Sequence, residues 1–425
     1  MVAQLDRACL GWTAKGTFAK KIGAGLVVAF LALATGTDGA SAAPSHHDES
    51  LRADLEAILD DHLQARRGPE GITGIAAFVS LAEGEPGISV SAGATDRSGR
   101  KPIDRRTLFQ IGSNTKAFTA ALVLKLEAEG RLDIDQTVGD WLPQYPAWKD
   151  NSIRQLLDMT SDIPTYSEAP TFMRAQAANK YRHYTPEELV AYAYPSPGNR
   201  LPPAEGWFYS NTNYVLAGLI AAKAGGASYD ELLRREIFRP LRLDDTSYSS
   251  WSNPPAVVRR LASGYFENPA CGLYRPGCTV GPLAPLAGQD MREADLSWAG
   301  AAGGIISTPQ DLERWVRALF SGEVLPPQQL EEMLQLVSTQ TGLPIAQATP
   351  ENPRGFSLGL VQLYHPELGR FWFYEGETLG YRAVFVWFAQ HDLVMTVMTN
   401  SQPPEGEDQI SLLVEGMYHA VTRRR

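Results

Sequence analysis

Apolar runs of strand length occur near both ends of the 425-residue chain. Two of them lie near residues 73–81 and 87–93, and three more lie near residues 370–376, 381–389 and 393–400. Each run is short and is bounded by turn residues, which is the pattern of a β-strand. We therefore expect one antiparallel sheet that is built from both ends of the chain.

Helical patterns flank these strands at residues 50–66 and 408–422, and we expect both helices to cover the sheet. The middle of the chain is rich in helical patterns and loops. The predicted fold class is α+β, with a sheet lobe formed by residues 43–112 and 301–425 and a mainly helical lobe formed by residues 113–300. We expect a ligand cleft where the two lobes meet.

The helical pattern that opens the middle region carries the first candidate chemistry. Gly112 interrupts a strand-like run, Gly130 ends the helix, and Ser113 and Lys116 lie in the first turn between them. Residues three apart are neighbours on a helix. Unpaired N–H groups and the helix dipole favour an anionic oxygen in this first turn. An S-x-x-K motif in this place suits a serine nucleophile with an activating amine.

The motif alone is a weak signal, because a serine in a first turn is ordinarily a cap and a lysine is ordinarily solvated. A second copy runs from Ser98 to Lys101, contains Gly99 and is followed by Pro102. These residues are typical of a turn, so we expect a solvated loop there. Ser113 becomes the stronger candidate only through the segments that follow it.

Two later segments support Ser113. Tyr209 and Asn211 form a Y-x-N motif before a helical run, and in extended chain two such residues point to the same side. Taken singly, this motif also fits a turn with a capping residue. The apolar and aromatic runs in residues 371–388 indicate two strands around a glycine-bearing turn.

With these three segments in this order, the chain resembles the serine β-lactamase and penicillin-binding-protein superfamily. It is most similar to the branch of class C β-lactamases and D-alanyl-D-alanine carboxypeptidases, which also contains esterases and D-amino-acid peptidases. Residues 153–161 and 301–311 resemble a family loop and a family glycine-rich segment. Class A enzymes carry S-D-N at the second motif, whereas this chain carries Tyr209-Ser-Asn211. The second motif therefore places the chain outside class A. The resemblance implies a β-lactamase/transpeptidase-like fold for nearly the whole chain after residue 42.

The third motif departs from the family pattern. Relatives usually place K-T-G or H-x-G on the strand beside the site, whereas the matching positions here are Tyr374, Glu375 and Gly376. A phenol donates a hydrogen bond but supplies no positive charge for a substrate carboxylate. Arg382 on the next strand is a candidate replacement for that charge. The change shifts our expectation toward neutral esters or amides.

The resemblance implies that Ser113 is acylated and that Lys116 and Tyr209 activate its hydroxyl. A lysine near its usual pKa of about 10.4 is protonated at neutral pH, so Lys116 must be desolvated or Tyr209 must share the proton. The sequence leaves open which of the two is the base. By the same resemblance, Asn211 holds a substrate amide and positions Lys116, and the backbone N–H groups of Ser113 and Glu377 form the oxyanion hole. The predicted substrate-binding residues are Asn211, Tyr374, Gly376, Glu377 and Arg382.

The first forty residues predict export. Lysines precede an apolar run at residues 22–34, which is too short for the roughly 20 residues of a membrane span. Small residues at 40–42 then form a cleavage site. We predict that residues 1–42 are a secretory signal peptide and that the mature protein is periplasmic or secreted without a stable membrane span. An uncleaved membrane anchor is the alternative.

Composition excludes little else. Cys271 and Cys278 lie close together in a loop rich in proline and glycine, so an exported protein is expected to join them in a disulfide, with reduced thiols as the alternative. The seven histidines show no metal-ligand spacing, and no metal or cofactor is predicted. A formal net charge of −10 does not suggest nucleic-acid binding.

The sequence therefore predicts an exported serine hydrolase that forms an acyl-enzyme on Ser113. Its substrate is a small molecule or a peptide, and neutral esters or amides lead. A D-alanyl-D-alanine carboxypeptidase or a class C-like β-lactamase is the alternative within the family. A non-catalytic binding protein that kept the fold is the alternative of another class, and the altered third motif is its only support.

Overall fold

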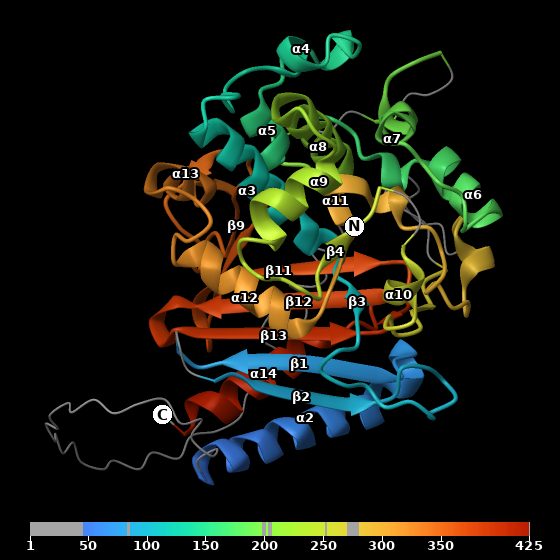
Figure 1. The fold of residues 1–425 in the computed structure, drawn as a ribbon, viewed down its shortest axis with the longest axis vertical. Helices are drawn as coiled ribbons and strands as arrows, with labels where there is room; N and C mark the ends of the chain where they lie inside the picture. Colours follow the sequence, from blue (N-terminus) through green and yellow to red (C-terminus); the bar gives the residue numbers. More distant parts are fainter. Residues whose placement is uncertain are drawn as a thin grey trace, which may run out of the picture.

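A computed structural model describes residues 46–82, 86–197, 201–202, 206–250, 253–269 and 280–424. Its centre is a nine-stranded antiparallel sheet with the strand order β2-β1-β13-β12-β11-β10-β9-β7-β8 (Figure 1). The strands are β1 Gly74–Ser80, β2 Ile88–Gly93, β7 Leu336–Ser338, β8 Pro344–Ile345, β9 Arg354–Phe356, β10 Val361–His365, β11 Gly369–Thr378, β12 Tyr381–Phe388 and β13 Leu393–Thr399.

The two ends of the chain meet inside this sheet. Strand β1 pairs with β13, so that Ile75 lies opposite Thr399 and Ser80 lies opposite Val394. All seven residues of β1 and all seven of β13 are buried, as expected for central strands that are covered on both faces. The prediction of one antiparallel sheet from both ends of the chain is confirmed.

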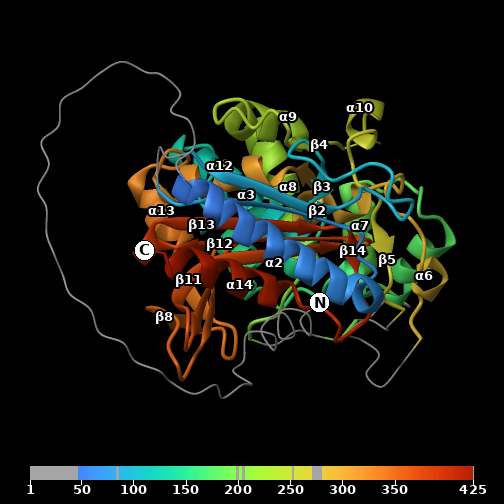
Figure 2. The ribbon, with the colours of Figure 1, turned by 90° about the horizontal axis from the view of Figure 1, so that it is seen from below.

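Helices cover both faces of the sheet. Helix α12 (Pro309–Phe320) crosses the front in Figure 1, and α14 (Ile410–Thr422) lies behind. Helix α2 (His46–Glu70) runs beside α14, which Figure 2 shows from below. Thr396 Oγ donates to the carbonyl of Pro309 at 2.8 Å and ties α12 to the sheet. The predicted terminal helices are therefore present, with α2 longer than the predicted range.

The middle of the chain is mainly helical and packs on the β11 side of the sheet. Short strands add two small sheets that the sequence did not predict. One joins β3 (Phe109–Gln110), β6 (Ile305–Ser307) and β4 (Ser247–Tyr248), and the other pairs β5 (Tyr265–Phe266) with β14 (Ser401–Gln402). The helices here are α3 Thr115–Ala128, α4 Val138–Trp141, α5 Ile153–Asp158, α6 Pro170–Ala178, α7 Pro186–Ala193, α8 Asn211–Gly225, α9 Tyr229–Leu233, α10 Pro255–Val258, α11 Gly300–Gly303 and α13 Pro327–Met333.

Helix α3 lies inside the molecule. Eleven of its fourteen residues are buried, so it is enclosed nearly all round instead of presenting the single apolar stripe that its sequence suggests. Helix α8 packs on one side of it and strand β11 lies beyond its first turn (Figure 1). Any polar side chain on the first turns of α3 is therefore held away from bulk water.

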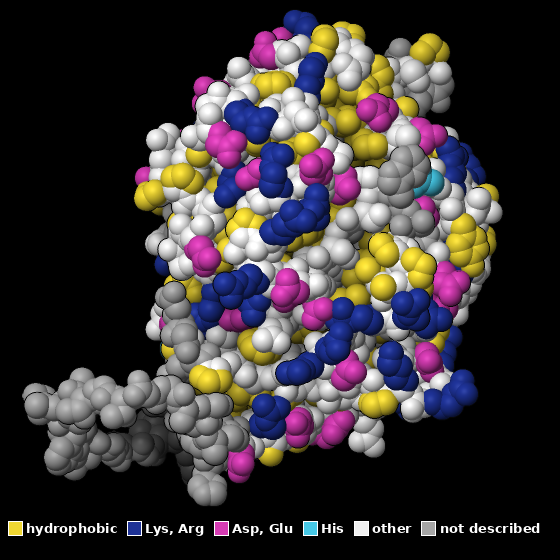
Figure 3. Space-filling model, viewed as in Figure 1, with side chains coloured by type: hydrophobic (Ala, Val, Ile, Leu, Met, Phe, Trp, Pro, Cys, Tyr) yellow, Lys and Arg dark blue, Asp and Glu magenta, His cyan; other side chains and the backbone are white. Residues whose placement is uncertain are grey.

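The described surface carries mixed charge. On the face in Figure 3, basic and acidic side chains are interspersed over α9, α12 and the sheet below them. None of the helices in the described part of the chain is long and apolar enough to cross a membrane. The predicted signal peptide and the pair Cys271 and Cys278 lie outside the described residues. Export, the disulfide and the division into two lobes stay predictions.

Candidate active site

A sharp turn delivers the serine to the centre of the molecule. Gly112 has φ +50, a conformation that favours glycine, and a Cβ at this position would lie 2.5 Å from the backbone nitrogen of Glu377. A 3-10 turn, Gly112–Asn114, then leads into α3. The amide of Asn114 donates to the carbonyls of Ile111 at 2.7 Å and Ala383 at 2.9 Å. The turn is thereby fixed to strand β12.

The structure brings the three predicted catalytic side chains together. Lys116 Nζ donates to Ser113 Oγ at 3.0 Å, and the hydroxyl of Tyr209 donates to the same oxygen at 2.7 Å. Ser113 is 7 % exposed, Tyr209 is 2 % exposed and Lys116 is fully buried. The serine oxygen therefore lies between an amine and a phenol that are both shielded from water.

Lys116 has no carboxylate partner in the described part of the chain. Its second hydrogen bond goes to the carbonyl of Ala302 at 2.8 Å, and within the described residues no carboxylate lies within 4.0 Å of its Nζ. The ring centroids of Tyr209 and Tyr214 lie 4.8 and 5.5 Å from that nitrogen. Burial lowers the pKa of Lys116 well below its usual range, because the charged form is disfavoured away from water.

Burial favours the neutral form of both tyrosines of the site, Tyr209 and Tyr374, by raising their pKa values. Burial raises the pKa of Tyr209 above its usual range, and its hydrogen bonds to Ser113 and Tyr374 only partly oppose this. Tyr374 is fully buried, and its hydroxyl lies 3.4 Å from that of Tyr209. Its ring packs edge to face against Phe356, with centroids 6.2 Å apart. The structure thus places Tyr374 behind Tyr209.

The backbone of Gly376 and Glu377 lies against the serine. A Cβ on Gly376 would lie 1.9 Å from the carbonyl of Ile111 and 2.7 Å from the backbone nitrogen of Ser113, so only glycine fits. Glu377 is opposite Arg382 in the sheet, and Gly376 is opposite Ala383. The side chain of Glu377 therefore belongs to the other face of the strand. Burial raises the pKa of Glu377 to about 7, and the nearby Asp408 adds to this.

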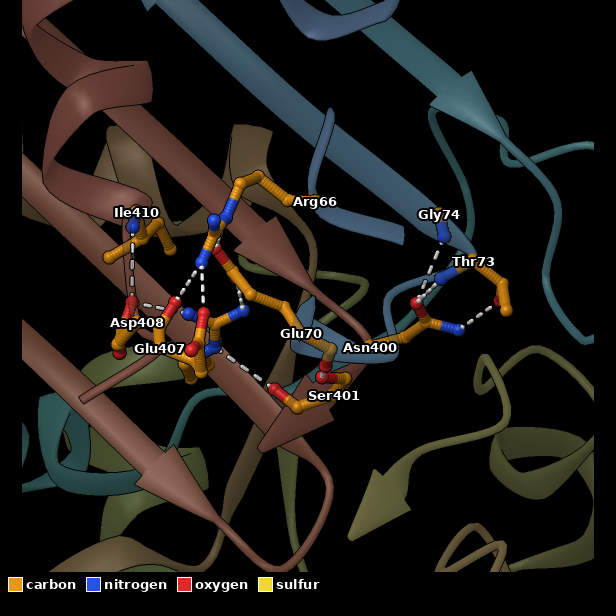
Figure 4. A network of polar contacts seen from close by, with 10 residues as sticks. Arg66, Glu70, Thr73, Gly74, Asn400, Ser401, Glu407, Asp408 and Ile410 are labelled. Carbon is orange, nitrogen blue, oxygen red and sulfur yellow. Dashed lines mark hydrogen bonds and ion pairs between the residues drawn. The ribbon is translucent and has the colours of Figure 1, made fainter. Parts of the chain in front are cut away.

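Arg382 does not face the site, which corrects the sequence-based expectation. Its guanidinium is fully buried and pairs with Glu70 at 2.5 Å and with Asp408, and it donates to the carbonyl of Ser401 at 3.0 Å. Figure 4 shows its partners, with Glu70 coming from α2 and Asp408 from the segment before α14. The reason is strand parity, since Arg382 shares the face of Glu377 rather than that of Gly376.

Asn211 is the first residue of α8 and lies at the edge of the cluster. Its side-chain amide donates to Ser167 Oγ at 2.9 Å, and its backbone N–H donates to Thr165 Oγ1 at 3.1 Å. The hydrogen bonds of Lys116 go to Ser113 and Ala302, so the expected contact from Asn211 to Lys116 is not one of them. Asn211 is two residues from Tyr209 in the sequence, but its hydrogen bonds go to Ser167 and Thr165.

The sequence did not identify the residues that connect α3 to the segment around α11. The N–H of Ile305 donates to Thr115 Oγ1 at 3.1 Å, and Thr119 Oγ1 donates to the carbonyl of Ala301 at 2.6 Å. The carbonyl of Ala302 binds Lys116 from the same segment. Backbone carbonyls carry no sequence signal, although the glycine-rich stretch itself was visible.

The second S-x-x-K motif lies outside this cluster. Ser98 is exposed in a turn, where its N–H binds Asp96 Oδ1 at 2.8 Å, so the second S-x-x-K is a loop as predicted. Throughout the described ranges, no group of three or more His, Cys, Asp or Glu residues is placed to hold a metal ion.

Comparisons with known proteins show the family to which this fold belongs. The model of the Beta-lactamase family matches residues 59–414. Penicillin-binding protein 4* of Bacillus subtilis (strain 168) is 26% identical over 331 residues, which cover 76% of this chain and 67% of that protein. The chain spans between half and about two thirds of the length of the curated relatives that it matches first.

Two solved structures share this fold, and the matched region covers nearly the full length of each. D-amino acid amidase from Ochrobactrum anthropi SV3, complexed with D-phenylalanine, is 26% identical with a TM-score of 0.71, and the match covers 88% of this chain and all of that one. D-stereospecific amidohydrolase from a Streptomyces species is 27% identical with a TM-score of 0.64, over 89% of this chain and 98% of that one.

Proposed function

Since the chain belongs to the Beta-lactamase family of serine hydrolases, we propose that Ser113 is its nucleophile and that amides or esters are its substrates. One observation carries the proposal. Ser113 Oγ lies within hydrogen-bond distance of both Lys116 Nζ and the Tyr209 hydroxyl, and the lysine has no carboxylate partner among the described residues. A buried amine without a counter-charge is neutral more readily than an exposed one, and a neutral amine can accept a proton.

The proposed reaction has two halves. Ser113 Oγ bonds to the substrate carbonyl carbon while its proton passes to Lys116 Nζ, and the carbonyl oxygen becomes an oxyanion. The backbone N–H groups of Ser113 and Glu377 are the proposed donors to that oxyanion, and one such donor is worth about 3 kcal/mol in the barrier. The bond from the carbonyl carbon to the amine or alcohol then breaks, and the leaving group takes the proton that Lys116 accepted, with the Tyr209 hydroxyl as the proposed relay. Water hydrolyses the remaining ester in the second half.

The charge around Tyr374 supports a neutral substrate. Tyr374 stands where the family pattern places a cation, and Arg382 is committed to Glu70 and Asp408 on the other side of the strand. A carboxylate beside the scissile bond would therefore lose its water without gaining an ion pair. The two amidohydrolases that share the fold act on amides by their names, and we infer the same bond class for this chain. Export to the periplasm or medium, with a Cys271–Cys278 disulfide, completes the proposal.

Covalent labelling tests the nucleophile. Purified protein is incubated with a fluorophosphonate and, separately, with a penicillin, and the adduct is located by peptide mass spectrometry. We expect the fluorophosphonate on Ser113 and no adduct in Ser113→Ala. The matched control is Ser98→Ala, which removes the serine of the other S-x-x-K motif and should label like the wild type.

The same experiment separates the alternatives. Stable acylation of Ser113 by penicillin would favour a penicillin-binding activity over an amidase. A folded Ser113→Ala variant that still hydrolyses a short p-nitrophenyl ester at the wild-type rate would contradict the assignment. Loss of labelling in Ser98→Ala would identify the other serine.

A further inference from the structure

One residue outside the three motifs accepts the backbone N–H groups of both residues next to Tyr209. The carbonyl of Met159 accepts the backbone N–H of Phe208 at 3.0 Å. Its thioether sulfur Sδ accepts the backbone N–H of Ser210 at 3.2 Å. Tyr209 lies between these two residues and reaches Ser113 Oγ with its hydroxyl. The direction in which the phenol leaves the backbone is therefore tied to Met159 from both sides.

Met159 adopts a conformation that costs free energy. It ends helix α5 with φ 69 and ψ 26, in the left-handed region that a side-chain-bearing residue rarely visits. Asp162, three residues on, has φ 58, so this loop contains two of the four described non-glycine residues with positive φ. Backbone strain of this kind costs about 1–3 kcal/mol and persists where the surroundings impose it. Met159 is fully buried.

The rest of the loop holds the same segment. Pro164 offers its carbonyl to the hydroxyls of Ser210 at 3.2 Å and Thr212 at 2.7 Å. Helix α8 begins directly afterwards, and Ser210 caps it without a side-chain hydrogen bond to the helix. The backbone N–H of Ser210 donates to the sulfur of Met159. A thioether is a weak acceptor, but without it this buried N–H would lose its partner.

We propose that Met159 is a positioning residue that sets the reach of the Tyr209 hydroxyl to Ser113 Oγ. The inference rests on the proposed function of Ser113 and Tyr209. Leucine would fill a similar volume at position 159 but offers no acceptor, so the Ser210 N–H would be left unsatisfied. An unsatisfied buried donor costs about 1–3 kcal/mol, and the segment relieves that cost by shifting. A shift of about 1 Å in a catalytic group can reduce the rate up to a hundredfold.

The test compares Met159→Leu with Met159→Gln, whose side-chain oxygen restores an acceptor at similar length. The readouts are the rate of Ser113 labelling by the fluorophosphonate, kcat and KM for a p-nitrophenyl ester, and the melting temperature. We expect Met159→Leu to lower kcat and the labelling rate about tenfold with KM little changed. Met159→Gln should recover most of that loss, because both variants share the same left-handed backbone.

A double-mutant cycle shows whether Met159 acts through Tyr209. In a Tyr209→Phe background the hydroxyl is absent, so Met159→Leu should cause less than a twofold further loss in the labelling rate. An equal tenfold loss in that background would overturn the inference and indicate a general structural effect. Wild-type kinetics in Met159→Leu would also overturn it.

The outcomes distinguish this inference from the proposed function. If Ser113→Ala abolishes labelling and Tyr209→Phe slows it while Met159→Leu does not, the function stands and the inference fails. If Ser113→Ala labels normally, or Tyr209→Phe is as fast as the wild type, the proposed roles of these residues fail and the inference fails with them.

Discussion

Two cations are fully buried among the residues that the structure describes, and they are held in opposite ways. Lys116 in the helical region donates to a serine hydroxyl and a carbonyl, and lacks a carboxylate within 4.0 Å among the residues the structure describes. Arg382 on β12 pairs with Glu70 and Asp408 and donates to the carbonyl of Ser401. These three partners are labelled in Figure 4. Within the described ranges, Lys116 has no carboxylate partner, whereas Arg382 has two.

The difference appears in the two pKa values. Burial lowers the pKa of Lys116 well below its usual range. Burial alone would also lower the pKa of Arg382, but Asp408 and Glu70 outweigh it and hold the pKa of that guanidinium above its usual range. The comparison teaches that a buried cation is reactive when its charge is uncompensated and structural when its charge is compensated.

Removing Lys116 should produce the largest effect, and it should fall on activity alone. Lys116→Met keeps the apolar stem and leaves no buried carboxylate without a partner, so we expect a loss of at least about a thousandfold in kcat/KM with little loss of stability. The control is Lys125→Met on the same helix, whose amine donates a long hydrogen bond of 3.4 Å to the carbonyl of Val324. A thermal melt and ester hydrolysis measure both quantities.

A folded Lys116→Met variant with activity within tenfold of the wild type would contradict this account. It would mean that Tyr209 alone removes the proton from Ser113. A large loss of activity in Lys125→Met would show that the substitution acts through α3 rather than through the amine.

Removing Arg382 should have the opposite signature. Arg382→Met removes one of the two cationic partners of the buried Glu70 carboxylate, and Arg66 remains at 2.8 Å. We therefore expect a loss of unfolding free energy no larger than about 3–5 kcal/mol, the cost of breaking a buried ion pair. Urea denaturation followed by tryptophan fluorescence measures it. Arg97→Met is the control, because the Arg97–Glu267 pair is half exposed and should cost only about 0–1 kcal/mol. Equal stability of Arg382→Met and the wild type would remove the structural role of this cluster.

A second cation placed in the site sharpens the comparison. Tyr374→Lys puts an amine behind Tyr209, where the family pattern has one, and it should favour substrates with a free carboxylate. We expect kcat/KM for a peptide with a free C-terminus, relative to its C-terminal amide, to rise about tenfold. Tyr374→Phe keeps the ring and should leave this ratio unchanged. A wild-type enzyme that already prefers the free acid would contradict the neutral-substrate proposal.

The smallest predicted effect concerns the aromatic faces near Lys116. The Tyr214 ring lies 5.5 Å from Nζ, and a cation–π contact of about 0.5–1 kcal/mol favours the protonated amine. Tyr214→Leu should lower the pKa of Lys116 further, which moves the acid limb of the kcat/KM profile to lower pH by roughly half a unit. Tyr214→Phe loses the hydrogen bond to the carbonyl of Leu157 but keeps the ring face. The acid limb of its kcat/KM profile should therefore stay at the wild-type pH. A shift to higher pH in Tyr214→Leu would refute this contribution.

Local spacing made part of this site predictable. Ser113 and Lys116 are three residues apart on a helix, so their contact follows from helix geometry alone. Tyr209 lies 96 residues from Ser113, and only the family resemblance connected the two. The strands and terminal helices were predictable because their apolar runs are long and bounded by turn residues. The burial of α3 on nearly all sides was not, because it depends on what packs around the helix.

Arg382 shows a signal that was present but not used. Leu379 and Gly380 form a two-residue turn between β11 and β12, and such a turn places Thr378 opposite Tyr381 and Arg382 opposite Glu377. That register alone puts Arg382 on the face away from Gly376. Its partners were beyond reach, because Glu70 is 312 residues away in the sequence. Met159 was missed for a similar reason, since no sequence pattern announces a sulfur acceptor.

The central claim is that the uncompensated burial of Lys116 provides the base for Ser113. The rate of fluorophosphonate labelling at Ser113, measured against pH in the wild type and in Lys116→Met, tests it most directly. A lowered pKa leaves the amine neutral above that pKa and protonated below it. The wild-type rate should therefore rise with pH and reach half its plateau well below the usual lysine value of about 10.4, and Lys116→Met should be slow without this rise. A wild-type midpoint near 10.4, or the same pH dependence in Lys116→Met, would contradict the account.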